Sequence, residues 1–133
     1  MTQKIVHVAV GIIKQQSQIF ICKRSAKQHQ GNKWEFPGGK VEVGETVTQA
    51  LARELKEEIN IEVVSSEAFH QIHHDYPDKS VYLDIHLVEN FKGEAVGHEG
   101  QESCWVEIQD LNKYEFPEAN KVIVEKLLKL NHI

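Results

Sequence analysis

The chain has 133 residues, of which 41% are hydrophobic and 26% are charged. We expect a single domain spanning residues 1–133, because this length suits one compact unit and the apolar fraction is high enough for a hydrophobic core. The same composition argues against intrinsic disorder. No stretch approaches the roughly 18 consecutive apolar residues of a transmembrane helix, and the first residues lack the small-residue cleavage site of a signal peptide.

The chain is acidic, with 20 acidic and 15 basic residues and a net charge of −5. This balance argues against a basic face that grips polymeric nucleic acid, but it allows a small phosphorylated substrate held through a metal ion. Cys22 and Cys104 are far apart and form no CxxC pair. They fit a reducing cytoplasm and argue against a disulfide framework or a thiolate zinc site.

The first third of the chain predicts two strands followed by a loop. Residues 4–13 are rich in valine and isoleucine, as in a buried strand, and residues 18–24 alternate apolar and polar side chains. The short polar segment 14–17 between them predicts a hairpin turn. Residues 25–45 are rich in glycine and predict a long irregular loop, a kind of segment that is usually functional in a compact domain.

Residues 46–59 predict an amphipathic helix. Thr46 and Gln49 have the spacing of a capping box, in which each side chain bonds a free backbone N–H of the first turn. Asn60 stands where the helix should end, and asparagine is the commonest substitute for glycine at the left-handed position after a helix.

The rest of the chain predicts three strands and a second helix. These elements are strands at 61–74, 80–91 and 103–108, a turn at Tyr76–Asp78, a glycine-rich acidic loop at 93–101, and a helix that Pro117 opens and that runs to Leu130. Strands dominate, and two helices are available to cover the faces of a sheet. The predicted fold class is therefore α/β, an α/β/α sandwich with a mixed, largely antiparallel sheet and two main helices.

Three glutamates gather on one side of the first predicted helix. At the helical rotation per residue, Glu54 and Glu58 lie within about 40° of each other, and Glu57 lies about 60° to the other side of Glu54. The same direction carries Val47 and Leu51, so an apolar stripe in the first half of the helix becomes a stripe of carboxylates in the second half. We therefore expect all three acids to face the body of the protein.

Converging carboxylates repel one another and lose hydration, and a divalent cation is the simplest way to stabilise them. Oxygen ligands select Mg²⁺ or Mn²⁺ over zinc, and Mg²⁺ often takes further ligands from a phosphate substrate. Periodicity alone leaves an alternative open, in which the acids form a solvated helix face paired with Arg53 and Lys56.

The segment also resembles a known signature. It fits G-x5-E-x7-R-E-U-x-E-E-x-G-U, with U aliphatic, which is the signature of the Nudix hydrolases. The matching residues are Gly39, Glu45, Arg53, Glu54, Leu55, Glu57, Glu58 and Ile61. Asn60 replaces the signature glycine, and we expect the backbone shape to survive because asparagine also adopts the left-handed conformation.

Other stretches resemble the MutT group of this family, which hydrolyses 8-oxo-dGTP. They are AVGII, EFPGGK, the HEGQ loop and FPxAN, and the likeness covers most of the chain. The resemblance implies a Nudix fold and hydrolysis of 8-oxo-dGTP to 8-oxo-dGMP and pyrophosphate, which keeps oxidised guanine out of DNA. We expect a cytoplasmic monomer whose partner is its nucleotide, not a polymeric nucleic acid or a membrane.

By position, the resemblance implies which residues bind metal. Glu54, Glu57 and Glu58 match the acids that bind metal and supply the catalytic base, while the Gly38 carbonyl and Glu99 match further ligands. Metal ions lower the pKa of the attacking water, and a carboxylate takes its proton. We favour Glu54 as that base, although the three acids are hard to separate because coupled groups titrate together.

The resemblance also implies orienting and phosphate-binding residues. Arg53 and Glu45 match the pair that orients the signature loop and helix. Arg24 matches a contact to the substrate phosphate, and His29 is expected near the nucleotide.

Asn120 matches the residue that reads the purine, and Phe36 is expected to line its pocket. Oxidation at C8 turns N7 of guanine from an acceptor into an N–H donor. A polar group set to accept from that N–H, such as an amide oxygen, is left unpaired by ordinary guanine and so discriminates against it.

Each of these residues has a plainer interpretation. Asn120 can cap a helix, Phe36 can be a core residue, Arg24 can be a surface strand residue, and Glu99 can be a solvated loop residue. The histidines around residues 70–74 suggest zinc, but neighbouring strand residues point to opposite faces.

Three other functions stay open. One is a Nudix hydrolase acting on another substrate, such as a nucleotide sugar or a dinucleoside polyphosphate. A second is a binding module that has lost catalysis, against which the complete set of acids argues. A third is a calcium-binding structural protein, which is disfavoured because the acids lie on a helix and not in a calcium-binding loop.

Overall fold

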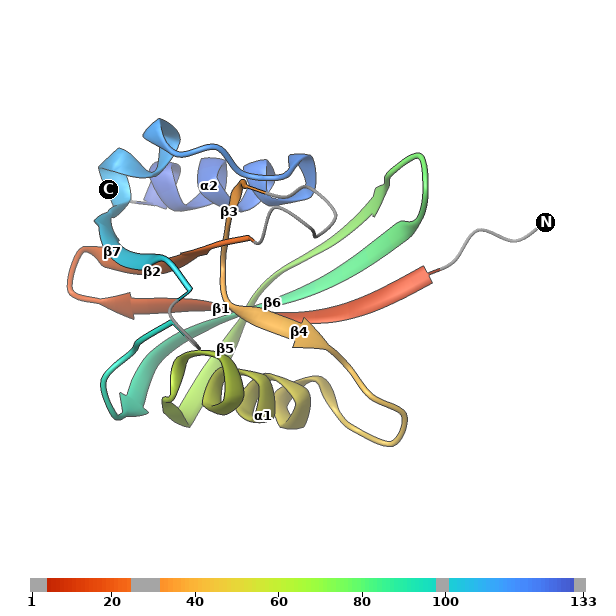
Figure 1. Ribbon diagram of the computed structural model, residues 1–133, viewed down its shortest axis with the longest axis horizontal. Coiled ribbons are helices and arrows are strands. Elements are labelled where there is room, and N and C mark those ends of the chain that lie inside the picture. Colours follow the sequence, from red (N-terminus) through yellow and green to blue (C-terminus); the bar gives the residue numbers. More distant parts are fainter. Residues whose placement is uncertain (1–4, 25–31, 98–100, 131–133) are drawn as a thin grey trace.

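The computed structural model describes residues 5–24, 32–97 and 101–130. A central sheet lies between two helices, with α1 (Val47–Ile59) on one face and α2 (Glu118–Leu130) on the other (Figure 1). This arrangement confirms the predicted α/β/α sandwich. No helix in the described part of the chain is long and apolar enough to span a bilayer. His29 and Glu99, two predicted site residues, lie outside the described residues.

The strands and one short helix fill the rest of the described chain. The strands are β1 (Ile5–Gln15), β2 (Gln18–Lys23), β3 (Trp34–Glu35), β4 (Gly38–Lys40), β5 (Glu62–Asp75), β6 (Ser80–Lys92) and β7 (Ser103–Glu107). A 3-10 helix at Ile108–Lys113 connects β7 to the segment before α2.

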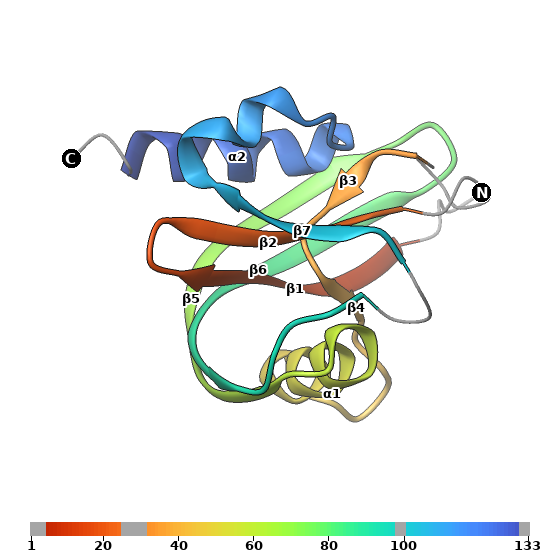
Figure 2. The same cartoon turned by 60° about the vertical axis from the view of Figure 1, so that its left-hand side comes forward.

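Strand β1 lies at the centre of the sheet. It pairs in parallel with β6, with Val6 opposite Val81 and Val10 opposite Ile85, and it pairs antiparallel with β2 and β4. Strand β5 pairs antiparallel with β6, and β3 and β7 pair antiparallel with β2. The sheet is therefore mixed and largely antiparallel, as predicted. Figure 2 shows β7 and β2 side by side below α2, with β4 close to α1.

The alternation of side chains along β1 divides the core into two parts. Val10 and Ile12 belong to the cluster that packs with α2, whereas Ala9 and Ile13 belong to the cluster that packs with α1. The buried residues of α1 are Ala50, Leu51, Leu55 and Ile59. Their burial fixes the rotation of α1 about its axis, and this rotation decides which of its glutamates face the sheet.

The expected loop at 25–45 is wrong in part, because its described portion contains β3 and β4. These strands have two and three residues, too few for an alternating pattern, and β4 is mostly glycine. The 3-10 helix was not predicted, since so short a helix shows no periodicity. Helix α2 begins at Glu118, so Pro117 precedes the helix instead of forming its first residue.

Both predicted ends of α1 are confirmed. Thr46 Oγ1 accepts a hydrogen bond from the Gln49 N–H at 3.2 Å, and Gln49 Oε1 accepts one from the Thr46 N–H at 2.9 Å. These two bonds form the reciprocal pair of a capping box. Asn60 follows the helix in the left-handed conformation, with φ of 60°. The turn after β5 is also confirmed, because Tyr76 and Lys79 exchange backbone hydrogen bonds.

We expect Asn60→Ala to lower the free energy of unfolding by about 1 kcal/mol, because the left-handed conformation disfavours a Cβ and alanine lacks the local hydrogen bonding that makes asparagine tolerant. Asn60→Gly should leave the free energy of unfolding unchanged or raise it slightly. Urea denaturation measures both variants. An equal loss in both would show that the asparagine side chain, and not the backbone conformation, stabilises this helix end.

Candidate active site

The three glutamates of α1 do not share one environment. The side chain of Glu54 is 20% exposed and that of Glu57 is 62% exposed, while Glu58 is half-buried. The expectation that all three turn inward is right for Glu54 and Glu58 and wrong for Glu57. Glu57 lies on the side of Glu54 away from Glu58, and that side of α1 is open to solvent in the structure.

The backbone of β4 provides the surface against which the two inner carboxylates lie. The Gly38 N–H donates a hydrogen bond to Glu58 Oε2 at 3.3 Å. A Cβ at Gly39 would lie 2.2 Å from the carboxyl carbon of Glu54, and one at Gly38 would lie 2.1 Å from the Ala9 carbonyl oxygen. Glycine at both positions is therefore what lets β4 approach α1 and β1 so closely.

Arg53 and Glu45 form a bidentate ion pair. Arg53 Nε and Nη2 donate to the two Glu45 oxygens at 2.8 and 2.9 Å. Arg53 also donates to Glu54 Oε2 and to the Lys40 carbonyl, both at 3.1 Å. The hydrogen bonds from Arg53 lower the pKa of Glu45 to about 2, so Glu45 is ionised near neutral pH. The pair joins the segment after β4 to α1 and supports the orienting role expected for both residues.

Glu35 on β3 adds a carboxylate that the sequence analysis missed. Burial raises the pKa of Glu58 to about 8, and the charge of Glu35 adds to the effect. Burial also raises the pKa of Glu35, which forms an ion pair with Arg24. Arg24 is therefore a half-buried partner of an acid and not a surface residue. The one sequence signal for Glu35 was a charged residue between the aromatic side chains of Trp34 and Phe36.

Cys22 on β2 is fully buried beside these acids and lies opposite Glu35 in the sheet. Burial raises the pKa of its thiol, and the negative charges of Glu58 and Glu35 raise it further. The thiol therefore stays protonated and packs as a small apolar side chain.

The donor groups fit a hard divalent cation. Burial raises the pKa of both Glu54 and Glu58, so a bound cation would favour the ionised forms that burial disfavours. Within the described residues, no three His, Cys, Asp or Glu side chains lie close enough to hold a metal ion. Arg53 Nη1 links two of the acids, at 3.1 Å from Glu54 and 3.5 Å from Glu57. The Gly38 carbonyl stays a predicted ligand.

Phe36, which follows β3, and Asn120, in the first turn of α2, are the two described residues predicted to contact the base. Phe36 stacks on Phe116 with ring centroids 5.0 Å apart and is 3% exposed, so most of its surface belongs to the core. The Trp34 N–H donates to the Glu115 carbonyl at 2.7 Å, which attaches β3 to the segment before α2. Asn120 is half-buried in the first turn of α2.

The histidines of β5 do not form a shared metal site. His73 Nε2 lies 3.3 Å from Asp75 Oδ1, whereas the ring of His74 packs edge-on against Tyr76. The alternation of strand residues separates the two imidazoles, as expected.

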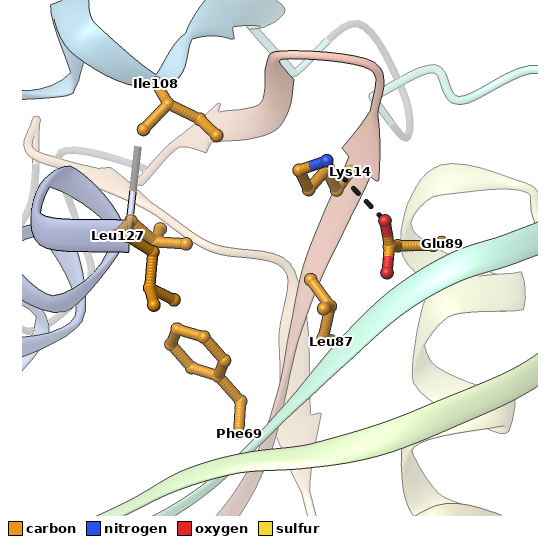
Figure 3. Close-up of a pocket in the computed structure, with 7 residues that line it drawn as sticks. Lys14, Phe69, Leu87, Glu89, Ile108 and Leu127 are labelled. Carbon is orange, nitrogen blue, oxygen red and sulfur yellow. Dashed lines mark ion pairs between the residues drawn. The ribbon is translucent and has the colours of Figure 1, made fainter. Parts of the chain in front are cut away.

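A groove of about 380 Å³ lies beside the second half of α2 (Figure 3). Its charged part is an ion pair between Lys14 and Glu89 at 3.5 Å. The rest of its lining is apolar and comprises Phe69, Leu87, Ile108, Leu127 and Leu130. The groove lies across the sheet from the glutamates of α1 and offers no comparable set of carboxylates.

Residues 8–126 match the NUDIX domain. The chain belongs to the NUDIX family. It is similar to the 8-oxo-dGTP diphosphatase of Escherichia coli K12, with 43% identity over 128 residues that cover 96% of this chain and 99% of the relative. It is also 32% identical, over 96% of this chain and 94% of the relative, to the CTP pyrophosphohydrolase of the same organism.

Solved structures share the fold of this chain. A MutT structure from work on Aliivibrio salmonicida and Vibrio cholerae is 46% identical to this chain, with a TM-score of 0.83, over 96% of this chain and 99% of that one. Nudix hydrolases generally need a divalent metal, which agrees with the oxygen donors found on α1.

We expect Gly39→Ala to lower kcat/KM by about 100-fold with little change in the thermal midpoint. The new Cβ would displace the Glu54 carboxylate, which is the movable end of a side chain, and a shift of about 1 Å in a reacting group costs on the order of 100-fold. Pyrophosphate release and a thermal melt measure the two effects.

The matched control is Gly44→Ala, which places a Cβ in open space but on a backbone with φ of 87°. It should lower stability and leave kcat/KM near the parent value. Equal activity losses in the two variants would contradict a specific role for Gly39.

We expect the metal-free protein to lose stability as pH rises from about 4.5 to about 8, the ordinary and raised pKa values of Glu58. Between them the folded state binds more protons than the unfolded state, so the free energy of unfolding falls with rising pH. Thermal melts in EDTA measure this slope. Glu58→Gln should flatten it, whereas the exposed Glu57→Gln should retain it. A slope unchanged in Glu58→Gln would contradict the assignment.

Proposed function

We propose that this chain hydrolyses 8-oxo-dGTP to 8-oxo-dGMP and pyrophosphate, and so keeps oxidised guanine out of DNA. The observation that carries the proposal is the placement of Glu54 and Glu58 against the β4 backbone, with Arg53 hydrogen-bonded to Glu54 beside them. Similarity over nearly the whole chain to a protein named 8-oxo-dGTP diphosphatase supports the choice of substrate.

We infer that Mg²⁺ is the metal and that its binding draws together Glu54, Glu57 and Glu58, which do not form a closed cluster in this structure, with Glu99 and the Gly38 carbonyl as further ligands. Donors that are all oxygen support Mg²⁺ or Mn²⁺ over zinc. When bound, such an ion lowers the pKa of the attacking water and neutralises charge on the phosphate oxygens. The exposed position of Glu57 suits a ligand that reaches the ion from the solvent side.

The carboxylates of α1 supply the proton acceptor. Attack of water on phosphorus requires a group that takes the proton of the water as the new bond forms. Glu54 suits this role because burial raises its pKa, which makes it a stronger base, while the hydrogen bond from Arg53 fixes its orientation. Glu58 interacts electrostatically with Glu54, so the two acids act as a coupled pair.

On the substrate side, we propose that Arg24 contacts a phosphate and that Asn120 reads the purine, with His29 nearby. Arg24 already forms an ion pair with Glu35, so a phosphate would share or replace that partner. Asn120 has an amide oxygen that can accept from the N7–H of 8-oxoguanine. Ordinary guanine leaves this acceptor unpaired, and such a mismatch discriminates strongly between nucleotides.

A second candidate substrate is CTP, supported by the likeness to the CTP pyrophosphohydrolase of E. coli. The reaction type would be the same, and only the contacts to the base would differ. The FPxAN stretch of the sequence favours the oxidised purine.

We further propose that the protein works as a monomer in the cytoplasm, with the nucleotide as its partner. Two free cysteines support a reducing compartment. The net charge of −5 disfavours polymeric nucleic acid as a ligand.

We expect Asn120→Ala to reduce the preference for 8-oxo-dGTP over dGTP by about 10-fold, because the amide oxygen that accepts from N7–H is lost. The measurement is kcat/KM for both nucleotides at saturating Mg²⁺. Glu54→Gln is the control and should lower kcat on both nucleotides by about 100-fold or more without changing their ratio. An unchanged ratio in Asn120→Ala would contradict the role of Asn120, and faster turnover of CTP by the parent would favour the second candidate.

A further inference from the structure

Helix α2 begins beside the core, and the residue before it has no side chain that can cap it. Pro117, the residue before the helix, is buried and has no polar side chain, and Ala119 in the first turn is 2% exposed. The first N–H groups of a helix have no partner within the helix, and a serine, threonine or aspartate before the helix usually supplies one. At this position the acceptor must come from elsewhere in the fold.

The hydroxyl of Tyr76 supplies that acceptor. The Ala119 N–H donates to Tyr76 Oη at 3.0 Å, across 43 residues of sequence. Tyr76 lies just after β5 and is 8% exposed, and the His74 ring packs edge-on against it with centroids 4.5 Å apart. Its N–H donates to the Lys79 carbonyl at 2.8 Å, which closes the turn between β5 and β6. The hydroxyl is therefore held in place from several sides.

The surroundings of Tyr76 include the charge of Arg24 and the start of α2, which carries Asn120. Burial raises the pKa of Tyr76, while the hydrogen bond from Ala119 and the positive charge of Arg24 act in the opposite direction. Asn120 directly follows Ala119, and its own N–H donates to the Pro117 carbonyl at 2.9 Å.

We propose that Tyr76 is a positioning residue for substrate specificity, whose hydroxyl fixes the start of α2 and thereby places Asn120 against the purine base. The proposal rests on the proposed function, in which Asn120 reads the base. Tyr76 acts through the helix and takes no part in the attack on phosphorus. Its loss should therefore change base discrimination and KM while leaving kcat nearly unaffected.

The test is Tyr76→Phe, which keeps the ring and removes only the acceptor. We expect KM for 8-oxo-dGTP to rise by about 10-fold, kcat to stay within about 2-fold, and the preference for 8-oxo-dGTP over dGTP to fall by about 10-fold. Tyr82→Phe is the matched control, because Tyr82 lies on β6 and packs against His7. It should change none of these values.

A double variant shows whether Tyr76 acts through Asn120. In the Asn120→Ala background, Tyr76→Phe should add no further change in KM, because the residue that it places has been removed. Independent losses that multiply would overturn the proposal, as would an unchanged preference in Tyr76→Phe or a loss confined to kcat.

A further measurement separates this proposal from the proposed function. Hydrogen exchange of the Ala119 amide should be faster in Tyr76→Phe than in Tyr82→Phe, whichever nucleotide is the substrate. A parent enzyme without any preference for 8-oxo-dGTP would refute the proposed substrate. The proposal on Tyr76 would then be tested on the dissociation constant for dGMP. The losses of affinity caused by Tyr76→Phe and by Asn120→Ala must again be non-additive, and additive losses would overturn the proposal.

Discussion

The chemistry proposed for this protein depends on holding carboxylates where the fold itself disfavours their charge. Glu54 and Glu58 lie on the side of α1 that faces the sheet, and burial raises the pKa of both. The apolar residues of the same helix, among them Leu51 and Leu55, are fully buried and set its rotation. The packing of these apolar residues therefore turns the two acids toward the sheet and buries them, which an isolated helix would not do.

The backbone of the β3–β4 segment connects the two halves of the proposed site. On one side it meets the acids of α1, through Gly38 and Gly39. On the other side Trp34 is hydrogen-bonded to the segment before α2. A movement of this segment would therefore displace both the acids of α1 and the start of α2, where the proposed contact to the base lies.

Much of this structure could be predicted from the sequence, because its strongest signals are local. The capping box at Thr46 and the left-handed Asn60 depend on a few neighbouring residues, and both are confirmed. Helical geometry predicted which side of α1 carries the three glutamates, but it did not predict that Glu57 lies outside the buried part of that side. Whether Glu57 turns inward depends on how far the sheet extends beneath α1, and the sequence of the helix does not contain that information.

Glu35 and Tyr76 could not be found in this way, because their importance comes from contacts distant in sequence. Glu35 interacts with Glu58 on α1, and Tyr76 bonds to the start of α2. A two-residue strand and a tyrosine in a turn look ordinary until the fold places them beside charged or capping positions.

The environment of Cys22 has a consequence for an enzyme proposed to act on oxidised nucleotides. Peroxide attacks thiolates, not thiols, and this sulfur is enclosed and surrounded by negative charge. Oxidative conditions that damage the guanine pool would therefore leave Cys22 reduced.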